Sequence, residues 1–311
     1  MTDIDLQLDH VAEAAKVIDP VFLNSPQYSD EQLNDRLGRR VLVKIETLNP
    51  LRSFKGRGAE YFAAGLEPGT TVVCGTSGNF GQAVAFAARK YGLRAELFVP
   101  AGVAPVKLRR MKALGARVRR VEGEAKVAAA AFAAEAPDRV FVVDGREPAI
   151  SEGAGTIGME LARVKGIDTV VLPVGDGALI AGVALWLKAH SPDVRVVGVG
   201  TTSAPAMERS WKAGKPITAD RANWFAGGIS IRTPEPESVR RLRSLIDDFV
   251  LVGDDDLRAA MRLGAETLGV VPEPAGAAGL AALTVHDIPG DFAATVVTGA
   301  NADLSVLGMA G

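Results

Sequence analysis

One lysine of this chain is placed for covalent chemistry: Lys55, in the glycine-rich stretch SFKGRG at positions 53–58. A protonated amine is a poor nucleophile, and an ordinary lysine has a pKa of about 10.4. Burial or a neighbouring cation lowers that pKa, so that the amine can condense with a carbonyl group. Here Phe54 would exclude water and Arg57 would add a nearby positive charge. The stretch therefore indicates a Schiff-base lysine, and the plainer alternative is a surface lysine at the start of a helix.

A second stretch, GTSGNFG at positions 75–81, combines three glycines with two hydroxyls and one amide. It follows an apolar run typical of a strand and precedes a segment of helical period. Backbone N–H groups at the N-terminus of a helix bind anions, and Thr76, Ser77 and Asn79 add polar side-chain atoms. Because a plain strand-to-helix turn needs one glycine rather than three, the stretch favours a binding loop for an anion such as a carboxylate.

A third stretch, GDGAL, follows the apolar run 169–174 and opens another helix-like segment. The N–H groups and the positive end of the helix dipole suit a phosphate group at such a place. A carboxylate at the second position would repel a phosphate unless its side chain points away, and the alternative is that it only caps the helix. The candidate phosphate-binding residues are Gly175, Asp176, Gly177, Ala178 and Leu179.

The remaining polar patterns carry less chemistry. The stretch GAGTIG at 153–158 has the spacing of a dinucleotide-binding fingerprint, but no strand directly precedes it, so it is interpreted as close packing at a helix start. The histidines His10, His190 and His286 lie outside the glycine turns, and neither a Ser–His–Asp triad nor a histidine metal site is expected. The acidic run 254–256 is expected to cap the helix that follows it.

Composition limits the partners and the location of the protein. The 311 residues include 48% hydrophobic and 23% charged residues, as in an ordinary globular protein. The net charge of −2 gives no electrostatic reason to expect nucleic acid or a membrane surface as a partner. A single cysteine, Cys74, excludes an internal disulfide, and no signal-peptide pattern or roughly 20-residue apolar span is present. These features predict a cytoplasmic protein that acts on a small molecule.

Short β-branched runs alternate with alanine- and leucine-rich segments of helical period. Strands are expected at 41–45, 71–74, 96–99, 140–143, 169–174, 194–199, 249–252 and 294–297. Helices are expected at 81–91, 106–114, 126–136, 155–165, 179–190 and 256–268. This alternation predicts an α/β fold of mostly parallel, twisted sheets with helices on both faces. So many strands favour two sheets in two lobes, with a cleft for a small ligand between them.

A Schiff-base lysine, a carboxylate loop and a phosphate loop together suit pyridoxal 5′-phosphate (PLP). The chain resembles the fold-type II, or tryptophan synthase β-like, family of PLP-dependent enzymes, nearest the threonine/serine dehydratase and serine racemase group. The matching stretches occur in family order over nearly the whole chain. They are SFKGRGA at 53–59, GTSGNFGQAVA at 75–85, KLRRMKALGA at 107–116, EGAGTIGMEL at 152–161, PVGDGALIAG at 173–182, EPAGAAGLAA at 273–282 and TGAN at 298–301.

The resemblance implies a role for each matching residue. Lys55 would form the Schiff base with the cofactor and act as acid and base at the substrate Cα. Phe54 would pack near the cofactor ring and Asn79 would bind its 3-oxygen. Thr298 would face the pyridine nitrogen, the loop 175–179 would hold the phosphate, and the stretch that contains Glu273 lies near the ring in relatives. The substrate would be bound by Ser53, Thr76, Ser77, Gly78 and Asn79.

The resemblance also implies a domain division. A large PLP-binding domain would comprise residues 1–68 and 149–311, and a smaller substrate-side domain would comprise residues 69–148. A homodimer is expected on the same ground.

The expected reaction follows from Thr298. Its neutral hydroxyl would leave the cofactor a weaker electron sink than an aspartate partner would, so negative charge at Cα should be short-lived and β-elimination is favoured over transamination. We therefore expect an ammonia-lyase that converts a small β-hydroxy or β-substituted amino acid into a 2-oxo acid and ammonia. The alternatives are racemisation with Ser77 as second acid/base, β-replacement as in cysteine synthases, and a non-catalytic amino-acid-binding protein.

Several positions depart from the pattern of that group. Leu51 and Arg52 precede the lysine stretch where a threonine and a glycine are usual, and Arg52 would either select an acidic substrate or bind a surface carboxylate. Phe80 replaces a histidine, which makes the substrate side more apolar. Asn223 and the stretch AGG at 226–228 lack the acidic residues of a divalent-cation site, so no metal is expected. The chain ends soon after TGAN, so no C-terminal regulatory domain is expected.

Overall fold

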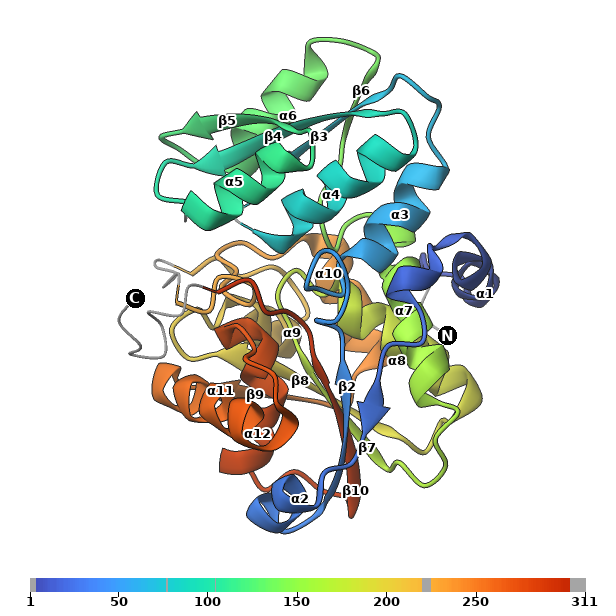
Figure 1. Cartoon of the computed structure of the whole chain (residues 1–311), viewed down its shortest axis with the longest axis vertical. Coiled ribbons are helices and arrows are strands. Elements are labelled where there is room, and N and C mark those ends of the chain that lie inside the picture. Colours follow the sequence, from blue (N-terminus) through green and yellow to red (C-terminus); the bar gives the residue numbers. More distant parts are fainter. Residues whose placement is uncertain (1–3, 77, 104, 220–224, 303–311) are drawn as a thin grey trace.

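The computed structural model describes residues 4–76, 78–103, 105–219 and 225–302, and in this part of the chain the molecule has two lobes with one sheet each (Figure 1). The six strands of the larger sheet pair in parallel, except that the first runs antiparallel to its neighbour. Their spatial order is β1 (Gln27–Tyr28), β2 (Arg40–Ile45), β10 (Phe292–Val297), β7 (Thr169–Pro173), β8 (Arg195–Thr201) and β9 (Asp248–Val252).

Apolar side chains alternate along the strands of the larger sheet, and helices cover both of its faces. On β7, Val170 and Leu172 enter one core while Val171 enters the other. The first core is completed by α7 (Pro148–Leu161), α8 (Ala178–His190), α9 (Ala206–Ala213) and α10 (Pro236–Leu245). The second is completed by α2 (Glu31–Leu37), α11 (Asp254–Leu268), η2 (Pro274–Ala277) and α12 (Ala278–Val285). Burial on both faces explains why these strands are near-continuous apolar runs in the sequence.

The smaller lobe contains four parallel strands within the described residues, in the order β5 (Arg117–Val121), β4 (Arg94–Pro100), β3 (Thr71–Gly75) and β6 (Arg139–Phe141). One face packs on α4 (Asn79–Lys90) and α5 (Pro105–Ala113), and the other packs on α6 (Ala125–Ala134). The helices α1 (Leu8–Val17) and α3 (Gly56–Ala64) lie where the lobes meet or beside that junction (Figure 1), and η1 (Pro20–Phe22) adds Phe22 to the core of the smaller lobe. Of these, α3 packs against both α4 and α7 and so joins the lobes.

The predicted α/β fold with two mostly parallel sheets is confirmed, but some elements were missed. The strand β5 has the sequence RVRRV, in which arginines interrupt the apolar run that would have signalled it. The helix α3 begins with GRG, and glycine is a poor helix former. The helix expected from residue 155 begins at Pro148, because proline is well tolerated at the first helical position.

The fingerprint-like glycine stretch lies within α7 and serves packing. A Cβ atom on Gly153 would lie 2.7 Å from the carbonyl oxygen of Arg57, and one on Gly155 would lie 2.9 Å from that of Gly182. Helices α3 and α8 therefore approach the backbone of α7 directly. The interpretation of this stretch as close packing is confirmed, but the stretch lies inside the helix rather than at its start.

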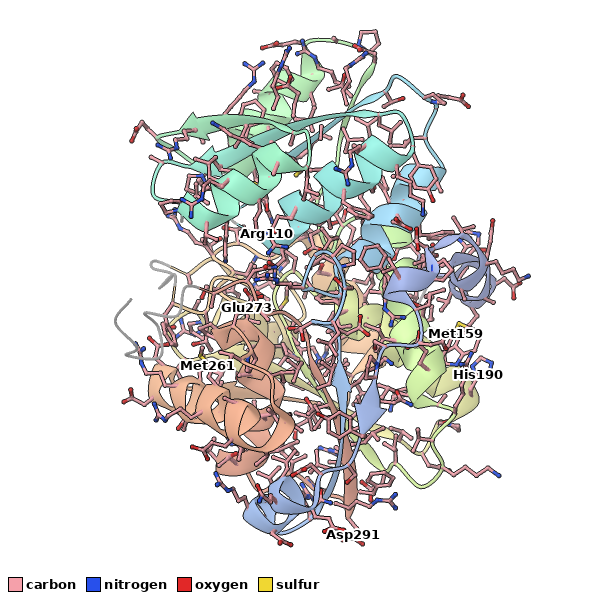
Figure 2. The ribbon with its side chains drawn as sticks, viewed as in Figure 1. Arg110, Met159, His190, Met261, Glu273 and Asp291 are labelled. Carbon is pink, nitrogen blue, oxygen red and sulfur yellow. The ribbon has the colours of Figure 1, made fainter. Side chains whose placement is uncertain are left out.

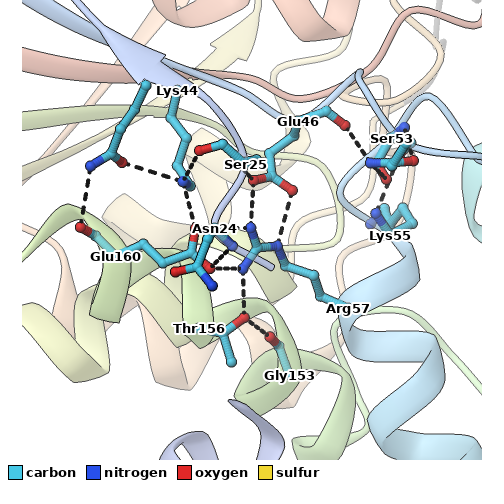
Figure 3. A network of polar contacts seen from close by, with 12 residues as sticks. Asn24, Ser25, Lys44, Glu46, Ser53, Lys55, Arg57, Gly153, Thr156 and Glu160 are labelled. Carbon is cyan, nitrogen blue, oxygen red and sulfur yellow. Dashed lines mark hydrogen bonds and ion pairs between the residues drawn. The ribbon is translucent and has the colours of Figure 1, made fainter. Parts of the chain in front are cut away.

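A buried ion network ties α3 to the larger sheet and to α7 (Figure 3). Arg57 is fully buried, and its five N–H donors bind Glu46, Glu160 and Thr156 at distances of 2.6 to 3.1 Å. A second buried cation, Lys44, places Nζ 2.5 Å from Glu160 Oε2. Because each charge has an opposite partner, the network anchors the helix that begins directly after the candidate lysine.

The carboxyl ends of both sheets face the space between the lobes. In the smaller lobe, β3 leads into the GTSGNFG loop and β5 leads into residues 122–126. In the larger lobe, β7 leads into the GDGAL loop and β10 leads into Thr298. All four segments contribute to one cavity. This matches the rule that open α/β sheets bind ligands outside the carboxyl ends of their strands.

Candidate active site

A cavity of about 650 Å³ lies between the two lobes, within the usual size range of small-molecule sites. Its lining comes from both lobes, and Figure 2 shows one of these residues, Glu273, close to the junction. The lining includes Phe54, Lys55, Thr76, Gly78, Asn79, Phe80, Lys126, Asp144, residues 175–179, Glu273 and Thr298. Most of the residues predicted to do chemistry are thus brought to one place.

Lys55 stands directly before α3, with its backbone tied to the end of β10. Its N–H donates to Ser53 Oγ at 3.3 Å, and the N–H of Phe54 donates to the carbonyl of Thr298 at 3.1 Å. The amino group lines the cavity, with Nζ 4.7 Å from the centre of the Phe54 ring and 5.9 Å from that of Phe80. Two aromatic rings therefore lie near the amine, and the packing of Phe54 against a cofactor ring stays a prediction.

The charged group that contacts Lys55 Nζ is a carboxylate rather than a cation. Nζ forms an ion pair with Asp144 Oδ2. The predicted contribution of Arg57 is not supported, because all of its donors are taken by the buried network around Glu46 and Glu160. Burial raises the pKa of Asp144, although the neighbouring Lys55 acts against that shift.

Asn79 opens α4, and both ends of its amide are held. Nδ2 donates to Glu273 Oε1 at 2.5 Å, and Oδ1 accepts from Asn301 Nδ2 at 2.9 Å. Asn301 also donates to the carbonyl of Leu51 at 2.8 Å, which links the amide to the loop before Lys55. The orientation of the Asn79 side chain in the cavity is therefore fixed from two sides, and its binding to a cofactor oxygen stays a prediction.

The residues predicted to bind the substrate are brought together only in part. Thr76 and Gly78 line the cavity, and Thr76 Oγ1 accepts hydrogen bonds from the N–H groups of Gly78 at 3.2 Å and of Gly81 at 3.1 Å. The Thr76 hydroxyl thus shapes the turn into α4. Ser77 lies outside the described residues. Ser53 is fully buried and is not part of the lining, so the structure does not bring it to the substrate side.

The GDGAL loop lies at the start of a helix that points into the cavity, and its binding of a phosphate stays a prediction. All five of its residues line the cavity at the N-terminus of α8. Gly177 has a φ of 92°, a conformation that favours glycine, and a Cβ on Gly175 would lie 2.2 Å from the carbonyl oxygen of Gly228. The glycines are therefore required by close approach and by backbone conformation.

A lysine from the smaller lobe neutralises the unusual carboxylate of this loop. Lys126 Nζ, from α6, lies 2.8 Å from Asp176 Oδ1 and 3.3 Å from Glu235 Oε1. Burial works against the charged form of Lys126, but the two carboxylates outweigh it and raise the pKa of the lysine. No side chain caps α8, so the alternative role of Asp176 as a helix cap is not supported. Its carboxylate is engaged in a contact between the lobes.

The other departures from the expected pattern separate into cavity and surface positions. Phe80 lines the cavity, and its effect on the polarity of the substrate side stays a prediction. Thr298, which matches the expected pattern, lines the cavity as well. Arg52 is exposed, has a left-handed backbone with φ of 49°, and is not part of the lining. Among the described residues, no group of three or more His, Cys, Asp or Glu side chains is placed to hold a metal ion, and Asn223 lies outside them.

Asp144 and Lys126 are among the cavity residues that the sequence reasoning missed. Asp144 directly follows the run 140–143 that was predicted to be a strand, and Lys126 follows the unrecognised strand β5. A position just past the carboxyl end of a parallel strand is a signal for a site residue. That signal was available for Asp144, whereas Lys126 depended on recognising β5.

The fold and the cavity together define an α/β protein in which a lysine and a glycine-rich loop at a helix start line one cavity between two lobes. A family model described as "Pyridoxal-phosphate dependent enzyme" matches residues 18–299. The chain belongs to this family, and its cofactor is PLP, as the resemblance predicted.

Three curated proteins are similar to this chain over nearly its whole length. An L-threonine ammonia-lyase of Thermotoga maritima is 31% identical over 310 residues, which cover 97% of this chain and 77% of the relative. A biosynthetic L-threonine dehydratase of Pasteurella multocida is 35% identical over 306 residues, or 94% of this chain and 59% of the relative. With a chloroplastic threonine dehydratase of Solanum lycopersicum, the match covers 49% of the relative. The chain therefore spans about half to three fifths of the length of these two longer curated relatives.

Solved structures confirm the fold-type II arrangement. Maize serine racemase superimposes with a TM-score of 0.91 at 28% identity, covering 97% of this chain and 95% of the other. A threonine deaminase from T.th. superimposes with a TM-score of 0.88 at 31% identity, covering 96% of this chain and 99% of the other.

The residues present fit PLP. The cofactor needs an amine for its carbonyl, an anion site for its phosphate and space for its ring. The Lys55 amine lines the cavity, the glycine loop at the N-terminus of α8 opens into the same cavity, and the rings of Phe54 and Phe80 lie beside the amine. A Cβ on Gly299 would lie 2.2 Å from Glu273 Oε1, so the backbone next to Thr298 is also packed closely against the site.

Proposed function

We propose that this protein is an ammonia-lyase that converts a small β-hydroxy or otherwise β-substituted amino acid into a 2-oxo acid and ammonia. One observation carries the proposal. The Lys55 amine shares a single cavity with the GTSGNFG loop, the GDGAL loop and the neutral hydroxyl residue Thr298. The curated relatives named as threonine dehydratases and as a threonine ammonia-lyase support the same reaction class.

Each residue of the site has a task in this reaction. When bound, PLP supplies an electron-withdrawing ring that stabilises negative charge at the substrate Cα. Lys55 would hold the cofactor covalently and then move the Cα proton. Thr76 and Gly78, with Ser77, would bind the substrate carboxylate. Asn79, oriented by Glu273, would hold the cofactor ring.

The loop at residues 175–179 would bind the cofactor phosphate, and the partners of its side chains explain how Asp176 is tolerated there. Its carboxylate is paired with Lys126, so it need not face the phosphate. Phe54 would pack beside the cofactor ring, and Thr298 would face its nitrogen. A neutral partner at that nitrogen favours rapid loss of the β-substituent over a long-lived carbanion.

A spectrum and a substrate screen test the proposal. The purified protein with added PLP should show a visible absorption band that is absent in Lys55→Ala and retained in the exposed control Lys215→Ala. It should then form 2-oxo acid from at least one of serine, threonine, 3-hydroxyaspartate and diaminopropionate. A visible band without 2-oxo acid from any of them would leave the cofactor assignment intact and overturn the reaction.

Racemisation is a second candidate, favoured by the similarity to maize serine racemase. It needs a second acid/base on the opposite side of Cα, and Ser77 is the residue proposed for it. Chiral analysis of unreacted serine during the assay would reveal this activity. Formation of cysteine from O-acetylserine and sulfide would instead favour β-replacement, and a protein without a visible band would favour a non-catalytic binding role.

We also propose the division into a PLP-binding domain (residues 1–68 and 149–311) and a substrate-side domain (residues 69–148), a cytoplasmic location and a homodimer. The sheets support the division, since β3 to β6 all fall between its boundaries. None of the helices described here is both long and apolar enough to cross a bilayer. Light scattering of the pure protein would test the dimer, and cell fractionation would test the location.

A further inference from the structure

Asp144 is a buried carboxylate at the cavity, and it has no role yet in the proposed β-elimination. It follows β6 on the way to α7, is 7% exposed and lines the cavity beside Lys55. Its Oδ2 atom pairs with Lys55 Nζ, and its Oδ1 atom has no hydrogen-bond partner among the described residues. Because an unpartnered buried polar atom is costly, such an atom in a cavity points to a ligand group that binds there.

The backbone next to Asp144 is held rigidly by a buried arginine. Arg241 donates to the carbonyl oxygens of Gly145 at 2.6 Å and of Arg146 at 2.8 Å, and it is itself paired with Asp5 at 2.7 and 2.8 Å. Ser238 Oγ also donates to the Gly145 carbonyl at 2.9 Å. The position of the carboxylate is therefore built into the fold and does not depend on an exposed loop.

The surroundings of Asp144 allow it to carry a proton. Burial raises the pKa of its carboxyl group, Lys55 and Lys126 act against this shift, and the carboxylate of Asp176 adds to it. Burial, and after it the nearby Asp144 charge, raise the pKa of the Cys74 thiol, so that this thiol stays neutral. A carboxyl group with a raised pKa beside a cavity is suited to general acid catalysis.

We propose that Asp144 is the general acid that protonates the β-leaving group of the substrate. The inference rests on the proposed β-elimination. Lys55 takes the proton from the substrate Cα, the bond between Cβ and the hydroxyl oxygen breaks, and that oxygen takes the proton of Asp144 and departs as water. The electron pair of the Cα–H bond becomes the new Cα–Cβ double bond. The two residues are then an ammonium and a carboxylate.

The ion pair in the structure joins the Lys55 ammonium to the Asp144 carboxylate, which are the charged forms that the proposed step would produce. Lys55 Nζ and Asp144 Oδ2 are in direct contact, so one proton can pass from the ammonium back to the carboxylate. This transfer restores the free amine and the carboxylic acid for the next turnover. No further acid, base or water is needed to close the proton cycle.

Leaving-group dependence tests the proposal in Asp144→Asn. A hydroxyl must be protonated to leave, whereas chloride leaves without a proton. With PLP bound, the variant should lose about 10²–10³-fold in kcat with serine or threonine, because a general acid contributes on that order. Its initial rate with β-chloroalanine should change by less than about fivefold, within the scatter of indirect effects. The exposed control Asp193→Asn should match the unmodified protein with both substrates.

Two readouts other than turnover keep the test informative. The visible spectrum and the Kd for PLP should be retained in Asp144→Asn. Exchange of the Cα proton of serine with deuterated water should persist, because removal of that proton belongs to Lys55. In the unmodified protein, kcat/KM for serine should fall at high pH as Asp144 loses its proton, while kcat/KM for β-chloroalanine should lack this fall.

The outcomes separate the two proposals. If the unmodified protein binds PLP but forms no 2-oxo acid from serine, threonine or β-chloroalanine, the β-elimination reaction fails and the acid role fails with it. If the unmodified protein is active, two results would overturn only the acid role. In one, the rate of Asp144→Asn falls equally with serine and with β-chloroalanine. In the other, it falls with neither substrate. If the variant does not fold, equal pH profiles of the unmodified protein for the two substrates would overturn the role.

Discussion

Lys55 and Arg57 are two positions apart in the chain and end in opposite kinds of environment. The Arg57 guanidinium is fully buried and uses all five donors on Glu46, Glu160 and Thr156. Lys55 reaches a cavity, where its amine has one ionic partner, Asp144, whose second oxygen is unpartnered among the described residues. The same stretch of sequence thus supplies one cation to the scaffold and one to the site.

These two environments distinguish structural charges from functional ones. A saturated network of buried charges resists change, because removing any member leaves the others without partners. An unsaturated pair at a cavity still has bonding capacity to offer a ligand. The two regions therefore differ in whether their hydrogen-bonding groups all have partners, and not in burial or charge alone.

The largest effect is expected for Lys55→Ala. If Lys55 holds the cofactor and moves the Cα proton, 2-oxo acid formation should fall by at least ~10³-fold, since both nucleophilic and acid–base functions are lost. The free energy of unfolding of the cofactor-free protein should change little, because Asp144 can take up a proton once its partner is gone. Paired activity and urea-unfolding measurements check this, and Lys215→Ala is the matched control. A large loss of stability would place Lys55 in the scaffold instead.

The opposite pattern is expected for Arg57→Met. The substitution keeps much of the volume but leaves Glu46 and Glu160 as buried charges with Lys44 as their remaining cation. Removing one partner of a buried ion pair costs about 3–5 kcal/mol, so Tm should fall by about 10 °C. The control Arg36→Met removes the exposed pair with Glu266 and should cost less than about 1 kcal/mol. Equal Tm values for the two variants would contradict the comparison.

The buried network should also be sensitive to acid through Glu160. Burial raises the pKa of this carboxyl group, but Arg57 and Lys44 outweigh burial, and the net shift is downward. A lowered pKa in the folded state contributes stability that is fully present above the ordinary glutamate pKa of about 4.3 and is lost as the pH falls through the folded value. We expect Glu160→Gln to be less stable than the unmodified protein by about 1–3 kcal/mol at neutral pH.

That stability difference should shrink below pH ~4, where the carboxylate of the unmodified protein begins to take up protons. Urea unfolding of both proteins from pH 7 to pH 3, around the ordinary glutamate value, measures the difference directly. A difference that stays constant across this range would show that the charge of Glu160 does not contribute.

The smallest effect is expected at the contact between the lobes. In Lys126→Gln, Asp176 would lose its main cation and stand unneutralised beside the phosphate loop. The Kd for PLP should rise by roughly 3–10-fold, in line with a partly exposed ion pair. The double variant Lys126→Gln/Asp176→Asn should recover most of the affinity. Absorbance titration of the cofactor-free protein with PLP measures both, and an unrecovered Kd would mean that Lys126 itself binds the phosphate.

Much of the fold was predictable because its signals are local. The buried strands β7, β8 and β10 are apolar runs, and the helices between them have a clear period. The strand β5 and the helix α3 were not predictable in this way, because arginines and glycines mask their patterns. Tertiary packing stabilises both elements despite their poor local propensity.

The candidate site was predictable in its residue types but not in its contacts. Asn79, Thr298 and the GDGAL loop were found from motifs and do line the cavity. Ser53 was also expected there, but it lies buried outside the lining. A motif specifies which residues are present and approximately where they lie, whereas the direction of each side chain depends on the elements packed around it.

The fold class and the PLP family could be predicted from the sequence alone, and Lys55 could be proposed as the Schiff-base residue, because these inferences depend on local periodicity and on motifs within one stretch. The partners of the charged side chains, by contrast, could be identified only in the folded structure. Lys55 meets Asp144 from 89 positions away, and Lys126 meets Asp176 from 50 positions away. Such pairs form where the carboxyl ends of strands from two sheets converge. The spacing of the strands along the chain does not predict which ends will lie together.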